Sequence, residues 1–493
     1  MADLCRAQAV LSEQQDRWVI TPDSSIEWKI AGRLPHHDHI EMSGEKVSLW
    51  VQYGVDSSGL PEVSRTVVFP TFRTKPNDTH ASLMYTFTDA DLPRIYINAE
   101  PLRADIINGR KRGNFPRQVE SIRQKGIMRI ESNIGAPSFL HLEHSLFPSV
   151  DKALALETFV FTNTSAKQAS VTMEYLKKEI HTDTSKSTGG PHIVSMETLQ
   201  YGNRVLKPGG SATFVVGYMA SPGSSFGEIH PDQEEALRKK RVDGILDLLR
   251  LETPDTVLNT AFAFAKIRAT ESIYKTRGGY MHSPGGLSYY AAIWANDQAE
   301  YVNPFFAMLG DKTAILSAMN SYRLFASYMN PEFKPIPSSI VAEGDSIWNG
   351  AGDRGDMAMI AYGASRFALS LGDQDSAATL WPLIEWCLEY CRRKINADGV
   401  VESDTDELER RFPSGKANLA TSSLYYDALR SASMLAHQLD KPSSVASGYL
   451  SRAKTMKENI EKYFGATVEG FKTYRYYQGN DVLRSWICLP LTM

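Results

Sequence analysis

A dense group of carboxylates marks the stretch GVVESDTDELERRF, residues 399–412. Carboxyl groups of this kind could protonate a leaving group or activate a water molecule. Acidic runs are also typical of a hydrated surface loop, which carries no chemistry. The acidic residues here are Glu402, Asp404, Asp406, Glu407 and Glu409. The rest of the chain must decide between a catalytic loop and a solvated one.

Aromatic and acidic residues also gather in SPGGLSYYAAIWANDQAEYVNPFFAMLGD, residues 283–311. Trp294 and Asp297 lie near the expected start of a helix, and Tyr289 and Tyr290 precede them. An acid at a helix N-terminus is favoured by the helix dipole alone, and aromatic residues at helical spacing commonly pack in a core. The functional alternative is a sugar site, in which the rings stack on a sugar face and Asp297 accepts bonds from hydroxyl groups.

A third loop, IVAEGDSIWNGAGDRGDMAMIAYG at 340–363, combines glycines and acids ahead of a predicted helix. Asp353 could simply cap that helix. In a sugar site, Trp348 would instead stack on a ring and Arg354 would donate to hydroxyl groups, with Asp353 in the wall. The remaining acids of this loop are Glu343, Asp345 and Asp356.

The segment LPHHDHIEMSG contains His36, His37, Asp38 and His39, which are residue types that can bind metals. In a strand, however, His37 and His39 share one face while His36 and Asp38 point the other way. An exposed polar turn is the simpler interpretation. We therefore expect no metal and no cofactor.

Composition excludes several classes of function. The chain has 493 residues, a formal net charge of −4 and a pI of about 6.3, with 42% hydrophobic and 22% charged residues. This composition predicts a soluble protein of two or three domains, present as a monomer or a homodimer. Nucleic acid and anionic membranes are not expected partners because both require a basic surface. No apolar run approaches the ~20 residues that span a bilayer.

The N-terminus leaves the cellular location open. The first residues, MADLCRAQAVLSEQQDRW, contain no long apolar core of a signal peptide. The tract RAQA is either a remnant of a removed export signal or an ordinary terminus. The first case favours a periplasmic or secreted protein and the second a cytoplasmic one. Cys387 and Cys391 lie four apart on a predicted helix and are expected to be buried, without a disulfide scaffold.

Residues 1–228 are predicted to form an antiparallel β-sandwich. Runs rich in β-branched and aromatic residues alternate with Gly, Pro and polar breaks. The segment 155–175 is predicted to be a hairpin, and 205–220 repeats its pattern of strand, turn and strand. Single strands are expected at 46–55, 65–72, 83–88 and 94–99.

Hydrophobic periodicity becomes helical near Pro231. We expect a linker helix within 229–252 and a helical domain over 253–493. Its helices are predicted in pairs joined by alternately short and long loops. They fall at 253–276, 290–309, 311–329, 354–371, 374–395, 418–438 and 441–464.

Residues 283–311 resemble two related families of enzymes that act on sugars. Trehalases carry P-G-G followed by Trp eight positions after the second Gly, and PGG at 284–286 keeps this spacing to Trp294. The Asp that trehalases place directly after this Trp is Ala295 here. Glucoamylase-like enzymes carry W-x-R-D, which resembles WAND at 294–297 with Asn in place of Arg.

The acidic run resembles a second motif of the same families. Trehalases and related α-glucosidases carry E-S-G-x-D, whose Asp is the general acid, and Glu402, Ser403 and Asp406 keep this pattern with Asp404 in place of Gly. The following segment, 418–441, is similar to the hairpin after this motif in those enzymes and in α-L-rhamnosidases.

The chain therefore resembles the six-hairpin glycosidase superfamily over residues 230–493. This resemblance implies a β-sandwich followed by an (α/α)6 toroid of about twelve helices, of which the sequence shows about seven or eight, so the toroid is expected to be incomplete. It further implies a glycoside hydrolase that acts on the terminal sugar of an oligo- or polysaccharide with inversion. The catalytic base is then expected beyond residue 493.

Glycoside hydrolysis needs one carboxyl group that stays protonated and a second carboxylate roughly 6.5–9.5 Å away for inversion. Burial or a neighbouring like charge keeps such an acid protonated. Asp406 is the predicted acid, and Glu402 and Asp404 are predicted to supply the like charge. The predicted substrate-binding residues are Tyr290, Trp294, Asp297, Trp348, Asp353 and Arg354.

Three alternatives remain. A polysaccharide lyase on the same architecture would abstract a proton with Tyr, His or Asn, and His282 is the histidine near the predicted site. A protein that has lost its base would bind carbohydrate without cleaving it. Phosphorolysis could replace hydrolysis, although no obvious phosphate-binding cluster is present.

Overall fold

The structure is a computed structural model and describes residues 18–30, 35–57, 59–74, 80–103, 105–107, 110–112, 115–182, 191–221, 228–283, 292–342, 347–348, 352–484 and 489–493. The chain divides into two compact units. Unit 1 consists of Met1–Thr74 and Leu83–Glu271, and unit 2 of Lys75–Ser82 and Ser272–Met493. Within the described residues, no helix is both long enough and apolar enough to cross a membrane.

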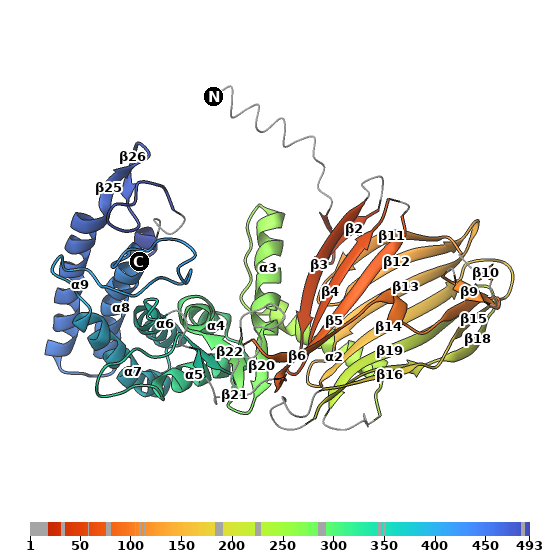
Figure 1. Cartoon of the computed structure of the whole chain (residues 1–493), viewed down its shortest axis with the longest axis horizontal. Helices are drawn as coiled ribbons and strands as arrows, with labels where there is room; N and C mark the ends of the chain where they lie inside the picture. Colours follow the sequence, from red (N-terminus) through yellow and green to blue (C-terminus); the bar gives the residue numbers. More distant parts are fainter. Residues whose placement is uncertain are drawn as a thin grey trace. The chain divides into compact units, whose positions relative to one another are not determined.

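Unit 1 is built from antiparallel sheets (Figure 1). The largest has the spatial order β1 (Val19–Ile20), β2 (Ile26–Lys29), β11 (Arg117–Gln124), β12 (Met128–Gly135), β13 (Ser138–Pro148), β14 (Leu154–Asn163), β19 (Ser211–Ser221), β17 (Ile193–Gln200) and β16 (Lys177–His181). A second sheet has the order β3 (His36–Ser43), β4 (Ser48–Val55), β5 (Pro61–Arg73) and β6 (Ser82–Phe87). A third has the order β18 (Gly202–Leu206), β15 (Ala169–Met173), β7 (Ile95–Ile97) and β8 (Glu100–Pro101). A short hairpin is formed by β9 (Asp105–Ile107) and β10 (Arg110–Arg112).

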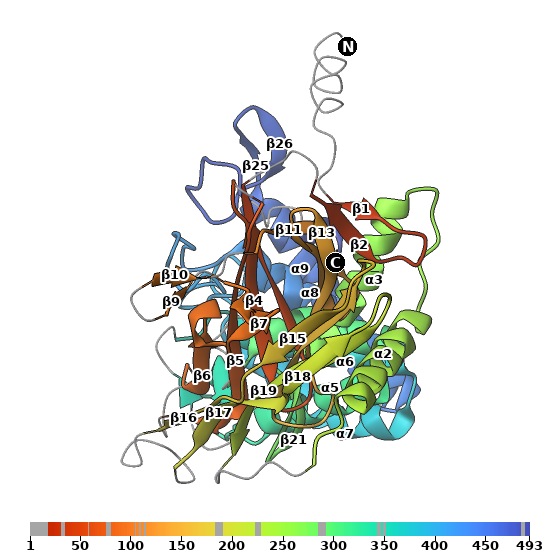
Figure 2. The ribbon, with the colours of Figure 1, turned by 90° about the vertical axis from the view of Figure 1, so that its right-hand side faces the viewer.

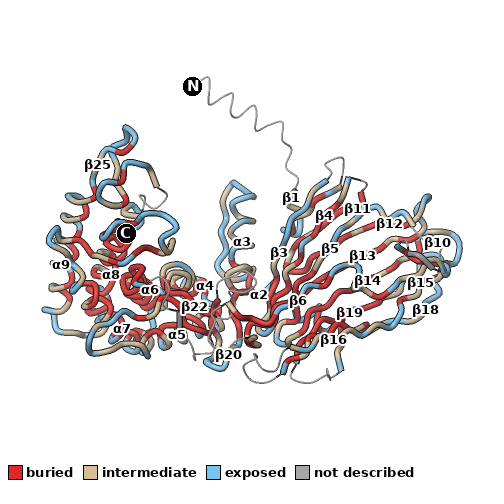
Figure 3. Tube along the Cα trace, viewed as in Figure 1, coloured by how far each residue is buried: buried red, intermediate tan, exposed pale blue. Residues whose placement is uncertain are grey.

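One apolar core joins the three larger sheets. Strand β12 alternates strictly between buried and half-buried residues, so its buried set lies on a single face. Residues from all three sheets belong to the same buried cluster, including Val51, Ile130 and Val171. Figure 2 shows this unit with β15 and β18 toward the viewer, and Figure 3 shows the buried residues in red. The predicted antiparallel β-rich region at the start of the chain is confirmed.

The two predicted hairpins are instead connections between sheets. Strand β14 pairs with β13 and β19, whereas β15 pairs with β18 and β7, so the turn after Asn163 crosses from one sheet to another. Strands β18 and β19, which are consecutive in the chain, likewise belong to different sheets. The buried Asn163 holds both turns, because its Nδ2 donates to the carbonyls of Lys167 at 2.7 Å and Leu206 at 2.9 Å. Alternation along a strand does not encode which strand pairs with it, so the prediction of hairpins was wrong.

Two helices, α2 (Pro231–Asp247) and α3 (Thr256–Glu271), belong to unit 1. The sequence-based division had placed a linker helix at 229–252 and the start of a helical domain at 253. The buried Arg238 of α2 donates to Glu271 of α3, to the carbonyl of Ser43 at 2.8 Å and to that of Gly126 at 2.9 Å. This network attaches both helices to the strands.

Unit 2 is mainly helical. It begins with the hairpin β20 (Ile273–Thr276) and β21 (Gly279–His282), and ends with the hairpin β25 (Gly465–Val468) and β26 (Phe471–Tyr474). Between them lie the sheet of β22 (Ala292–Trp294), β23 (Ser339–Val341) and β24 (Ile347–Trp348) and the π-helical segment η3 (Asn296–Val302). The helices are α4 (Asn303–Leu309), α5 (Lys312–Ala326), α6 (Asp356–Leu371), α7 (Gln374–Arg393), α8 (Leu419–Gln438) and α9 (Ser443–Phe464).

The helices follow the predicted order of pairs. Helix α6 contacts both α4 and α8, and α5, α7 and α9 each follow one of these three along the chain (Figure 1). A helical region after a β-rich region is therefore confirmed, and closure into a toroid stays a prediction. The predicted helix 290–309 is partly wrong, because residues 292–294 pair as β22 with β23 before η3 and α4 begin.

Candidate active site

The acidic loop lies against the start of α6. The backbone N–H groups of Asp404 and Thr405 donate to the carbonyl of Asp353 at 2.9 and 3.1 Å. In return, the N–H of Asp353 donates to Asp404 Oδ2 at 3.0 Å. This reciprocal contact fixes residues 403–411 beside the first turn of α6. Asp404, predicted to supply like charge to the catalytic acid, is thus an anchor of the loop.

Arg354, directly before α6, organises the site. It is 1% exposed and donates to Asp356 Oδ1 at 2.9 Å and to Glu409 Oε1 at 3.0 Å. Its Nη2 also lies 3.3 Å from Asn296 Oδ1 and 3.3 Å from the carbonyl of Ser338. Arg354 therefore connects the acidic loop to η3. These bonds to protein atoms explain Arg354 as a positioning residue, and a contact with sugar hydroxyls stays a prediction.

Glu407 of the acidic loop faces η3. Its Oε2 accepts from Asn296 Nδ2 at 3.2 Å, and the hydroxyl of Tyr301 donates to both carboxyl oxygens at 3.1 and 3.2 Å. Donors from two positions of η3 thus fix the orientation of this carboxyl group. Burial raises the pKa of Glu407, against the lowering effect of these hydrogen bonds.

Two further carboxyl groups of η3 complete what we call the carboxyl cluster: Asp297, Glu300 and Glu407. Burial raises the pKa of Asp297 to about 6. Burial, followed by the negative charges of Glu407 and Asp297, raises the pKa of Glu300 to about 8. Carboxyl groups whose pKa is raised in this way are unusual, and perturbations of this kind concentrate at functional sites.

The π-helical turn explains how η3 presents these side chains. The N–H of Asn303 bonds to the carbonyl of Gln298, five residues earlier, which is the wide spacing of a π-helix. Such turns are rare and often occur at functional sites. Gly363 of α6 lets the two backbones meet, because a Cβ at this position would lie 1.7 Å from the carbonyl oxygen of Ala299. The close packing of α6 therefore supports η3.

Asp406, the predicted general acid, lies outside this cluster. It is 2% exposed, its Oδ2 lies 3.3 Å from Arg484 Nη2, and its Oδ1 accepts from the N–H of Leu408 at 3.0 Å. The ion pair between Asp406 and the half-buried Arg484 is consistent with a structural role for Asp406. Glu402 is half-buried, and its closest side-chain partner is Asn396 Nδ2 at 3.5 Å. The catalytic roles of both residues stay predictions.

Two other predicted site residues, Asp353 and Trp294, are buried and contact protein groups. Asp353 is 2% exposed and accepts from Tyr390 Oη at 2.7 Å and from the N–H of Gly355 at 2.9 Å. Burial raises its pKa to about 6. Trp294 is 6% exposed and packs edge-to-face with His80, with ring centroids 5.8 Å apart. These contacts suit structural roles for Asp353 and Trp294.

Several predicted residues cannot be placed. Tyr289, Tyr290, Glu343 and Asp345 lie outside the described residues, and Trp348 is described only as part of β24, without its side chain. No role is predicted from the sequence for four residues of this site: Asn296, Glu300, Tyr301 and Glu407. A signal for two of them was present, because Glu300 lies three residues after Asp297 and Glu407 stands beside Asp406 in the acidic run.

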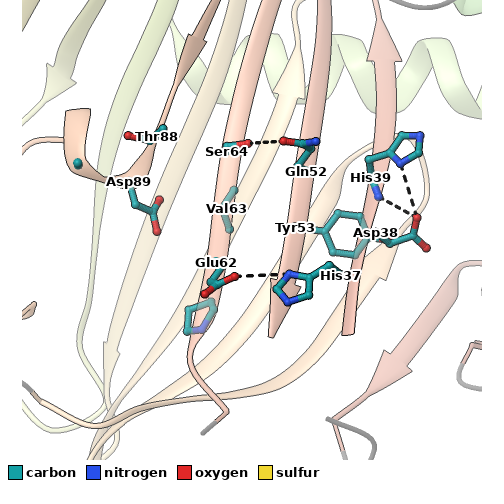
Figure 4. A pocket seen from close by; sticks show the side chains of 12 residues that line it. His37, Asp38, His39, Gln52, Tyr53, Glu62, Val63, Ser64, Thr88 and Asp89 are labelled. Atoms are coloured by element: carbon teal, nitrogen blue, oxygen red, sulfur yellow. Dashed lines mark hydrogen bonds and ion pairs between the residues drawn. The ribbon is translucent and has the colours of Figure 1, made fainter. Parts of the chain in front are cut away.

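His37 and His39 of β3 line a groove in unit 1 with a volume of about 670 Å³ (Figure 4). His37 stands opposite Gly54 and His39 opposite Gln52 in the pairing of β3 with β4. His37 Nδ1 lies 3.5 Å from Glu62 Oε2, as the dashed line in Figure 4 marks. Within the described part of the chain, no three His, Cys, Asp or Glu side chains are grouped as a metal site.

Comparison with known proteins gives similarities of structure only. No family model matches the chain, and no curated protein matches it. A solved bacterial glucoamylase complexed with acarbose has a TM-score of 0.49 at 11% identity, over 93% of this chain and 75% of that one. A candidate kojibiose phosphorylase from the human microbiome has a TM-score of 0.49 at 10% identity, over 90% and 70%. A family 105 glycoside hydrolase from C. acetobutylicum ATCC 824 has a TM-score of 0.34 at 12% identity, over 50% and 69%.

A glucoamylase, a member of one of the families that the motifs resemble, is therefore among the solved structures similar to this chain. At these identities and TM-scores the family of the chain stays unassigned, and its own residues must carry the functional inference.

Proposed function

We propose that the chain cleaves glycosidic bonds, with Glu407 as the proton donor to the leaving oxygen. The observation that carries this proposal is the carboxyl cluster, in which three acids with raised pKa values interact and Glu407 is held by Asn296 and Tyr301. A glycosidase needs an acid that is protonated at its working pH and held in a fixed direction. Asn296 and Tyr301 orient Glu407 in this way.

Asp297 takes a supporting role in this proposal, because its negative charge favours the protonated form of Glu407. Asp297 matches the sugar-holding Asp of the motif at 294–297, so it is proposed to accept bonds from sugar hydroxyls. The base that activates water is not assigned. Action on the terminal sugar of an oligo- or polysaccharide, with inversion, completes the proposal.

The lyase alternative lacks a suitable base in the described residues of this site. Burial lowers the pKa of His282 to about 3, and Gln298 Nε2 lies 3.1 Å from its Nδ1. Burial and the charge of Glu300 raise the pKa of Tyr301, so its phenolate is disfavoured. Neither the imidazole of His282 nor the phenol of Tyr301 is therefore a suitable base for removing a proton from a sugar at neutral pH.

The first test is activity on a panel of oligosaccharides and aryl glycosides, with and without inorganic phosphate. We expect Glu407→Gln to lower kcat by a factor of roughly 10² or more. The loss should be smaller on aryl glycosides whose phenols are good leaving groups, because these need no protonation. A rate that depends on phosphate would indicate phosphorolysis.

The matched control is Asp406→Asn, the neighbouring acid. Its kcat, per mole of folded protein, should stay within about tenfold of wild type because Asp406 does not contact the cluster. The reverse pattern, in which Asp406→Asn is inactive and Glu407→Gln is active, returns the role of acid to Asp406. Binding of a sugar by calorimetry, with no turnover on any substrate of the panel, would indicate a carbohydrate-binding protein.

A further inference from the structure

A cavity with a volume of about 340 Å³ lies inside unit 1. Its lining comes from the largest sheet, through β13 and β14, and from the third sheet, through β15. The side chains of Leu142, Phe159 and Met173 are all at most 3% exposed and form apolar wall. Arg94 and Arg103 lie at its exposed rim, and Arg117 of β11 lies inside. A volume of this size suits a small organic molecule.

Arg117 carries a donor without an acceptor. Its Nε donates to Ser132 Oγ at 3.2 Å, whereas its Nη2 is buried and has no acceptor among the described residues. Burial lowers the pKa of Arg117 to about 10, which shows that its charge is poorly compensated. A buried cationic donor without a partner is costly, and in native proteins it commonly marks a place for an ion or a ligand.

The nearby carboxylates are already engaged by other groups. Asp89 accepts from Arg65 at 2.8 Å and pairs with Arg103 at 3.1 Å. Glu157 accepts from Arg65 at 2.7 Å and lies 2.5 Å from His144 Nε2. Burial lowers the pKa of His144, so it adds no charge at neutral pH. Among the described residues, the guanidinium groups of Arg65, Arg103 and Arg117 thus lie near these two carboxylates, and Arg117 pairs with neither of them.

We propose that this cavity binds a small organic monocarboxylate. The carboxylate would accept from Arg117, and the apolar body would lie against Leu142, Phe159 and Met173. The single buried guanidinium of Arg117, whose Nη2 has no acceptor among the described residues, matches a monoanion better than a phosphate dianion. A guanidinium also presents planar donors that fit a carboxylate. The apolar wall disfavours a hydrated inorganic anion, which would lose water without regaining hydrogen bonds.

The test uses the full chain and benzoate as the probe, with benzamide as its uncharged counterpart. Calorimetry should detect benzoate binding, and the Tm should rise with benzoate concentration. Benzamide, inorganic phosphate and chloride should each bind at least tenfold more weakly. If benzamide binds as tightly as benzoate, the charge of the carboxylate is not recognised. If phosphate or chloride binds as tightly as benzoate, the cavity does not select an organic ligand. Either result overturns the proposal.

Variants assign the binding to this cavity. Arg117→Met should weaken benzoate at least tenfold. Arg123→Met is the matched control, because Arg123 lies on the same strand, pairs with Asp23 at 2.6 Å and should keep its affinity. Ala90→Trp places a bulky side chain at the exposed rim and leaves Arg117 intact. Ala90→Trp should also abolish benzoate binding while preserving the circular dichroism spectrum. If Ala90→Trp and folded Arg117→Met both bind benzoate with wild-type affinity, the proposal is wrong.

Discussion

Glu407 and Asp406 are neighbours in sequence but have different environments. Asp406 faces Arg484, whereas Glu407 faces Asn296 and Tyr301 of η3. Glu407 lies in a turn in which the N–H of Glu409 donates to the carbonyl of Asp406 at 2.9 Å, and the path of this turn decides which acid enters the site. The sequence could predict that this acidic run lies near residues 294–297. It could not predict which carboxylate does so, because that depends on the path of the loop over α6.

Glu300 gives a prediction at the scale of one residue. Its pKa is about 8 in the folded chain against an ordinary value of 4.5. Between these two values the folded chain holds a proton that the unfolded chain has released, so stability falls as pH rises through this window. Glu300→Gln removes that dependence. Its Tm should match wild type at pH 5 and exceed it by roughly a few degrees at pH 8.5.

Thermal unfolding followed by circular dichroism over this pH range measures the effect. Glu332→Gln, on an exposed turn of unit 2, is the control and should track wild type at every pH. Parallel pH profiles for Glu300→Gln and wild type would show that Glu300 does not hold a proton in the folded chain. The carboxyl cluster would then need another explanation.

At the scale of elements, the sequence predicts the positions of most helices well, but it does not predict local irregularities such as a π-helical turn. The start of α6 near Asp356 and the pair α8 and α9 lie within about two residues of expectation, because capping residues and apolar periodicity mark them. The π-helical turn of η3 was not predicted. It depends on packing against α6 rather than on the residues of η3 alone.

Gly363→Ala tests that packing. The added Cβ would overlap the carbonyl of Ala299, so the free energy of unfolding should fall by about 3 kcal/mol or more. Because the backbone of η3 must shift, kcat should fall as well. Gly448→Ala on α9 is the control: nothing lies within 4 Å of its Cβ, and the substitution should stabilise the chain by about 0.5–1 kcal/mol. Chemical denaturation measures both, and equal effects of the two substitutions would contradict the close contact.

At the scale of the whole molecule, hydrophobic periodicity alone predicts a β-rich region followed by a helical region. Periodicity does not predict where the boundary between the two units lies. The sequence predicts α2 as a linker helix and α3 as the first helix of the helical domain, whereas both belong to unit 1. Arg238 attaches them to the strands through partners more than one hundred residues away in the chain, Ser43 and Gly126. Single-sequence periodicity carries no information about such long-range pairs.

Arg238→Met should therefore loosen unit 1 without affecting unit 2. The substitution removes a buried partner of Glu271 and the hydrogen bonds that Arg238 donates to the carbonyls of Ser43 and Gly126, which should cost about 3–5 kcal/mol. Hydrogen exchange should accelerate in α3 and at the end of β3, and stay unchanged in α6 and α8, because each unit has its own buried core. Lys239→Met is the neighbouring control, since Lys239 is exposed and pairs with Glu235 on the helix surface. Faster exchange spread equally over both units would show that they unfold together and that the division at residue 271 has no energetic meaning.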